Sequence, residues 1–84
     1  MNLEKVLKSG DEVRIKSDRD IFVTTIDEVT GEDTFTILAP YKQGQQVIIR
    51  QNEIFSVSCV TERGLLMFDM RVMAIDNTSN VIVI

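Results

Sequence analysis

The spacing of apolar residues changes once along the chain, at Gly10. Before it, Leu3, Val6 and Leu7 recur at i, i+3 and i+4, which predicts a short helical turn that Gly10 ends. An irregular N-terminus is the alternative. After Gly10, apolar and polar residues alternate, as in "EVRIK" (12–16), and this period of two predicts half-buried β-strands.

The following runs predict more strands separated by polar turns. Run 21–30 is rich in β-branched residues, but its alternation slips around Thr24-Thr25, which predicts a bulge or a bend. Run 34–39 ends at Pro40, which has no backbone N–H to donate to a ladder. The remaining predicted strands are 46–50, 54–62, 65–75 and 81–84.

Short turns between strands require antiparallel neighbours, since a parallel crossover takes a dozen residues or more. The chain of 84 residues is one domain, and it is too short for a two-sheet sandwich of about 100 residues. The predicted fold is therefore all-β: a small antiparallel split β-barrel of six or seven strands, closed into a cylinder, with the helical turn at its N-terminus.

Charge and composition favour a cytoplasmic protein that binds neither nucleic acid nor membranes. The net charge is −4, and the basic residues are scattered, whereas phosphate-rich partners require clustered Lys and Arg. No signal peptide precedes the first strand, and no apolar run approaches the roughly 20 residues of a membrane span. The single cysteine, Cys59, lies in an apolar run and is predicted to be a buried hydrophobe.

The residue types argue against an enzyme. The chain has no histidine, which removes the commonest general base and metal ligand, and one cysteine cannot build a zinc site. The acidic pairs 27–28 and 32–33 read as solvated turn residues, because adjacent strand residues point to opposite faces. The sequence therefore predicts no catalytic residue, no metal and no cofactor in this chain.

The aromatic residues allow two interpretations. Phe22, Phe35, Phe55 and Phe68 each occur once per predicted strand beside β-branched residues, which favours core packing over base stacking. Tyr41 follows Pro40 in a predicted loop and is a candidate for a partly exposed contact.

The order of features resembles the PilZN domain, the N-terminal (YcgR-like) domain of flagellar-brake-type PilZ proteins. The pattern is a Gly-Asp before the first strand, a bent second strand, a third strand ending in Pro, a Gly-x-x-Val segment and a final Gly-Leu-x-x-Phe-x-x-x-Val strand. The matching residues are Gly10, Asp11, Pro40, Gly44, Val47, Gly64, Leu65, Phe68 and Val72.

The resemblance implies that a C-terminal PilZ domain follows in cis and binds cyclic di-GMP through an Arg-x-x-x-Arg segment and an Asp/Asn-x-Ser-x-x-Gly strand. Here Arg63 and Arg71 are eight positions apart, and Ile82 takes the place of the glycine after Asn77. The chain alone is therefore not expected to bind the nucleotide. By the same resemblance, the other partner is the flagellar motor and the output is motility control.

The chain ends in "NVIVI", so it is expected to be the N-terminal fragment of a longer protein, with a complete small protein as the alternative. The predicted interdomain or partner contacts are Tyr41, Val81, Ile82, Val83 and Ile84. Two other functions remain open: a single-stranded nucleic-acid-binding barrel, and a structural domain that self-associates by strand addition through residues 81–84.

Overall fold

The computed structural model contains one short 3₁₀ turn and nine β-strands in the part of the chain that it describes, residues 2–18, 20–76 and 81–83. The elements are η1 (Leu3–Lys5), β1 (Glu12–Lys16), β2 (Ile21–Val29), β3 (Phe35–Leu38), β4 (Tyr41–Lys42), β5 (Gln45–Gln46), β6 (Ile54–Thr61), β7 (Gly64–Arg71), β8 (Ala74–Asp76) and β9 (Val81–Val83). The predicted all-β class and N-terminal turn are confirmed.

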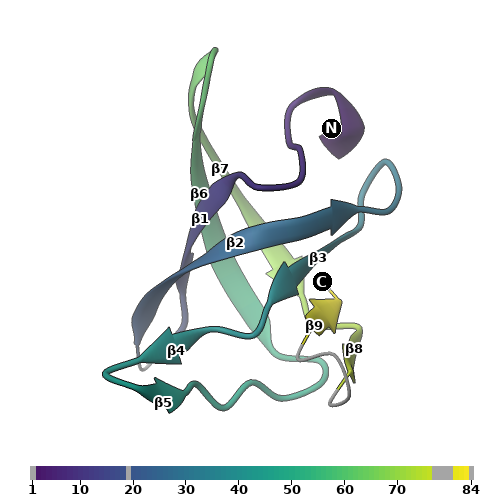
Figure 1. The fold of residues 1–84 in the computed structure, drawn as a ribbon. Helices are drawn as coiled ribbons and strands as arrows, with labels where there is room; N and C mark the ends of the chain where they lie inside the picture. Colours follow the sequence, from purple (N-terminus) through teal and green to yellow (C-terminus); the bar gives the residue numbers. More distant parts are fainter. Residues whose placement is uncertain (1, 19, 77–80, 84) are drawn as a thin grey trace.

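Seven strands form one antiparallel sheet in the order β7-β6-β1-β2-β3-β9-β8, and β4 and β5 form a separate hairpin (Figure 1). The sheet curls around a core to which β1, β2, β3 and β6 contribute their inward residues. Thirteen buried apolar residues form this core: Leu3, Leu7, Val13, Ile15, Phe22, Ile26, Phe35, Ile37, Ile49, Phe55, Val57, Cys59 and Val72.

The expected closure into a complete cylinder is wrong. Among the described residues no ladder joins β7 to β8, so these two strands are the edges of an open sheet. The chain itself bridges the edges, because only Val72 and Met73 separate β7 from β8. Val72 is fully buried at this junction; its N–H donates to Glu53 O (2.9 Å), and its carbonyl accepts from Asn52 N–H (2.8 Å). We call the Val72–Met73 link the seam.

The bend predicted in the second strand is present, but it lies later than expected. The register between β2 and β3 shifts between Ile26 and Glu28. Thr24 does not interrupt the alternation: it points inward, is 8% exposed, and its hydroxyl donates to Leu38 O at 2.7 Å. A hydroxyl that finds a backbone acceptor can occupy an inward position at little cost.

Two predicted strands are shorter than expected. Residues 47–50, predicted as part of a strand, have no regular structure, because the chain has already turned back at Gln43-Gly44 between β4 and β5. Both turn residues have positive φ, 53° and 80°, as a tight hairpin turn requires. The predicted strand 65–75 is interrupted at the seam and continues as β8.

The N-terminal turn covers one end of the curled sheet. Asn2 caps η1 by accepting from Glu4 N–H at 3.0 Å, and Leu3 N–H donates to Glu32 O at 2.7 Å. Leu3 and Leu7 are both buried in the core, at 4% and 3% exposure. The turn is therefore part of the folded domain.

Candidate functional site

The β6–β7 hairpin carries apolar side chains on its outer face as well as its inner face. It extends past the other strands (Figure 1). Phe55, Val57 and Cys59 of β6 point into the core, whereas Val60 is 82% exposed on the outer side. On β7, Leu65 and Met67 are each 66% exposed. Because adjacent strand residues point to opposite faces, both sides of β7 are apolar.

Strand register places basic residues on the same outer face. Arg14 of β1 lies opposite Ser58 of β6, and Ser58 lies opposite Met67 of β7. Lys16 lies opposite Ser56 in the next row. Neighbouring strands are about 4.8 Å apart, so the bases lie within two strands of the apolar residues. A hollow of about 310 Å³ on this side is lined by two acids and one base among mostly uncharged residues: Asp11, Glu12, Arg14, Ser58, Cys59, Val60 and Leu65.

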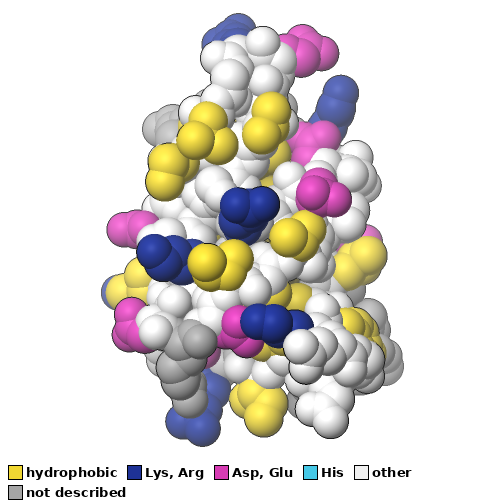
Figure 2. Space-filling view, turned by 90° about the vertical axis from the view of Figure 1, so that its left-hand side faces the viewer, with side chains coloured by type: hydrophobic (Ala, Val, Ile, Leu, Met, Phe, Trp, Pro, Cys, Tyr) yellow, Lys and Arg dark blue, Asp and Glu magenta, His cyan; other side chains and the backbone are white. Residues whose placement is uncertain are grey.

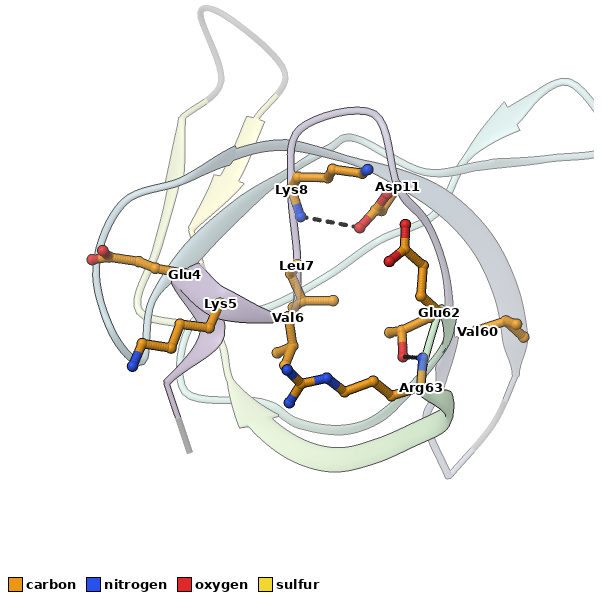
Figure 3. Close-up of a pocket in the computed structure, with 10 residues that line it drawn as sticks. Glu4, Lys5, Val6, Leu7, Lys8, Asp11, Val60, Glu62 and Arg63 are labelled. Atoms are coloured by element: carbon orange, nitrogen blue, oxygen red, sulfur yellow. Dashed lines mark hydrogen bonds between the residues drawn. The ribbon is translucent and has the colours of Figure 1, made fainter.

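A second hollow, of about 430 Å³, separates the N-terminal turn from the tip of the β6–β7 hairpin. Figure 3 shows Arg63 reaching from the tip toward Val6, with Asp11 and Glu62 on the other side. The Lys8 N–H donates to Asp11 Oδ2 at 3.0 Å, and the Arg63 N–H donates to Thr61 Oγ1 at 3.2 Å. The charged lining residues are three bases and three acids: Lys5, Lys8, Arg63, Glu4, Asp11 and Glu62. Their balanced charge favours no ligand of one sign.

A third hollow, of about 560 Å³, lies beside the β4–β5 hairpin. The Lys42 ammonium forms an ion pair with the Asp20 carboxylate and so ties the hairpin to the β1–β2 turn. The Lys42 hydrogen bond, helped by the Ile21 N–H, holds the pKa of Asp20 below its usual value. Tyr41, in the same hairpin, is 57% exposed, as the sequence predicts.

We expect the anchor of the β4–β5 hairpin to be lost in acid. Because the folded-state pKa of Asp20 is depressed, its stabilising effect is present at neutral pH and disappears as the pH falls below about 4. Backbone NMR shifts of residues 41–46 should move toward random-coil values between pH 5 and pH 2. Asp20→Asn should show the same shifts at pH 7. Asp18→Asn, in the same turn, is the matched control. If both variants changed the shifts of residues 41–46 equally at pH 7, the role of the Asp20–Lys42 ion pair as the anchor would be contradicted.

The predicted contact residues at the C-terminus lie within the sheet rather than at its edge. The backbone of β9 pairs with β3 on one side and with β8 on the other. Strand addition through Val81, Ile82 and Val83 would therefore require β8 to leave first. Ile84 lies outside the described residues. A role for these residues and for Tyr41 in partner contact stays a prediction.

The phenylalanine rings and the single cysteine, which the sequence offered as candidate functional groups, pack in or against the core. Phe22 packs edge-to-face on Phe55 and Phe35 on Phe68, with ring centroids 6.0 and 6.2 Å apart, which confirms core packing. Cys59 is buried, and burial, followed by the charge of Asp11, raises the pKa of its thiol. Such a thiol is poorly reactive, since the thiolate is the nucleophile.

The described residues hold neither a metal-binding cluster nor a membrane-spanning helix. They contain no group of three or more Cys, Asp or Glu side chains that could hold a metal ion. None of their helices is long and apolar enough to cross a membrane.

The alternation of apolar and polar positions did not predict the exposed residues Val60, Leu65 and Met67. The run "GLLMFDM" contains a usable signal, because apolar residues at consecutive positions place apolar side chains on both faces of a strand.

The chain matches a known protein family. Residues 7–84 match the family model PilZNR, which is described as flagellar protein YcgR. No curated protein and no solved structure matches the chain.

Proposed function

Since the chain belongs to the PilZNR family of YcgR-type flagellar proteins, we propose that it is a non-catalytic regulatory domain of a cyclic-di-GMP-responsive PilZ protein that controls flagellar motility. The family match over residues 7–84 is the observation that carries this proposal. The structure adds an all-β body with an exposed apolar hairpin face, which suits a binding module.

The nucleotide itself is expected to be bound elsewhere in the protein. Arg63 lies at the hairpin tip and Arg71 at the opposite end of β7, so these two side chains do not form the Arg-x-x-x-Arg segment that the family resemblance associates with cyclic di-GMP. The role of this chain is to present a surface whose exposure depends on its arrangement relative to a PilZ domain. A ligand that binds one arrangement more tightly shifts the population toward it.

The nucleic-acid alternative was based on four phenylalanine rings, and the structure buries them wholly or partly. Phe22, Phe35 and Phe55 are at most 4% exposed, and Phe68 is half-buried, so their rings are not available to stack on bases. The strand proposed for self-association, β9, is already paired with β3 and β8, which argues against strand addition there.

The test is a deletion in the full gene product that carries this chain. In cells that lack the chromosomal gene, the full-length protein is expected to reduce swimming speed when cyclic di-GMP is raised, whereas the protein without residues 1–84 is expected to have little effect. Calorimetric titration with cyclic di-GMP provides the control: the shortened protein should still bind the nucleotide. Equal slowing by the shortened protein would refute the proposed role, as would a full-length protein that leaves swimming unchanged.

A further inference from the structure

Strand β7 presents a long hydrogen-bonding edge. Among the described residues its one neighbour in the sheet is β6, so its other side faces outward. It is eight residues long and contains neither a proline nor a register shift against β6, whereas the opposite edge strand, β8, has three residues. Prolines, bulges and short length are devices that keep an edge strand from pairing with another chain, and β7 has none of them.

Alternate residues of β7 point their backbone groups away from β6. In an antiparallel ladder, one residue exchanges both hydrogen bonds with its partner and the next residue exchanges none. Val72 bonds through its N–H and its carbonyl to Glu53 and Asn52, just before β6. At the other end of β7, Gly64 O accepts from Thr61 Oγ1 at 3.0 Å. The even-numbered residues of β7 therefore face β6, and the odd-numbered ones direct their N–H and C=O groups to the outer edge.

The same odd-numbered residues carry the exposed side chains of β7. Leu65 and Met67 are each two-thirds exposed, and Asp69 and Arg71 follow them along the strand. Val60, opposite Leu65 on β6, extends the apolar stretch, and Figure 2 shows hydrophobic side chains gathered below the hairpin tip. The edge thus has an apolar half near the tip and a charged half near the seam.

We propose that β7 pairs with β7 of a second copy of this chain, in antiparallel orientation about a two-fold axis at Leu66. In this register Leu65 of each copy lies opposite Met67 of the other, and their edge amides exchange hydrogen bonds. Arg63 at each hairpin tip lies opposite Asp69 of the other copy. Such an interface uses the same surface on both copies, as a two-fold axis requires. The pairing does not depend on the proposed motility role.

The side-chain pattern of the edge matches its own reverse in this register. Apolar side chains meet apolar ones and each carboxylate meets a guanidinium, and both kinds of cross-strand pair stabilise a sheet. Shifting one copy along by the next step that keeps the edge amides opposite each other would place Leu65 opposite Asp69. A register that sets Asp69 opposite Arg71 would leave only residues 69–71 of β7 to pair. Balanced charge along the edge therefore suits an identical partner.

The position of the hairpin leaves room for the second copy. The β6–β7 hairpin extends past the other strands, and the pairing is centred near its tip (Figure 1). In the antiparallel arrangement the two tips point in opposite directions, so the body of each copy lies beyond the tip of the other. The two sheets then join into one, in which β7 is no longer an edge.

Sedimentation equilibrium of the 84-residue chain measures this association. A monomer–dimer equilibrium is expected, with a dissociation constant of about 1–100 μM because the paired edge is short. Met67→Lys places a charge opposite Leu65 of the other copy and is expected to raise the dissociation constant at least tenfold. Val23→Lys is the matched control, since Val23 is exposed on β2, three strands from the edge, and this variant should associate as the unchanged chain does.

Charge reversal tests the two ion pairs of the interface. Arg63→Asp places two carboxylates opposite each other at both ends of the pairing and is expected to weaken the dimer about tenfold. Arg63→Asp/Asp69→Arg restores opposite charges and is expected to recover most of the affinity. A chain that stays monomeric at about 1 mM, or a dimer that Met67→Lys and Arg63→Asp leave unchanged, would overturn the proposal.

Disulfide formation tests the register directly. Residues 65 and 67 of opposite copies would form a hydrogen-bonded pair with Cα atoms about 5.5 Å apart, a separation that a disulfide can span. Mixing Leu65→Cys chains with Met67→Cys chains is therefore expected to give a cross-linked dimer at least tenfold faster than either variant gives alone. Cys59 is buried and does not compete.

Equal rates of cross-linking in the mixture and in the single variants would refute this register. Circular dichroism of every variant verifies folding, and the cysteine mixture still supplies an answer if Met67→Lys unfolds the chain.

Discussion

Replacing Phe35 by alanine is expected to lower the free energy of unfolding by about 3–5 kcal/mol. The ring is fully buried at the centre of the core and packs edge-to-face on Phe68. Removing it leaves a cavity that the neighbouring strands, held by ladders on both sides of β3, cannot fill by moving. A domain of this size has about 4–12 kcal/mol of stability in total, so the loss is a large fraction of it.

Urea unfolding followed by circular dichroism measures this effect. Leu38→Ala is the control on the same strand, because Leu38 is 46% exposed on the opposite face and should cost much less. A Phe35→Ala variant whose urea midpoint matches that of Leu38→Ala would contradict the core described here.

Replacing Leu7 by alanine is expected to cost about 2–5 kcal/mol, although the residue lies outside the sheet. Leu7 is 3% exposed, and its N–H donates to Leu3 O at 2.8 Å, so its side chain and its backbone both fix the N-terminal turn against the core. If the turn were a loosely attached extension, the substitution would have almost no effect on the unfolding midpoint. Lys8→Ala, at the next position, which is exposed, is the control. An unfolding midpoint of Leu7→Ala equal to that of Lys8→Ala would mean that the turn is loosely attached.

Period-two alternation predicted the strands well wherever one face is buried and the other is solvated. The runs 12–16, 21–30, 34–39 and 54–62 all contain strands whose buried positions fall on the expected residues, such as Val13 and Ile15. Alternation failed where backbone geometry decides the structure. The turn at Gln43-Gly44 and the hydrogen bonds of Val72 depend on positive φ and on long-range partners, and a pattern of apolar residues does not encode either of them.

The candidate surface was harder to predict than the fold. The sequence shows that "GLLMFDM" is apolar at consecutive positions, but it does not show which side of β7 faces the core. That choice follows from the register with β6, which pairs Val57 with Phe68 and Val60 with Leu65. Arg14 and Lys16 join Met67 on one face only because β6 pairs with β1, far away in the sequence.

The sheet order also determines how the chain must fold. The β1–β6 ladder joins Ile15 to Val57, 42 positions apart, and the β3–β9 ladder joins Ile37 to Ile82, 45 positions apart. Hairpins form within microseconds, whereas such distant pairings must first overcome the entropy of closing long loops. Folding is therefore expected to be limited by a chain search for these two ladders. During synthesis, the second ladder cannot begin to form until the ribosome has released residues 81–83.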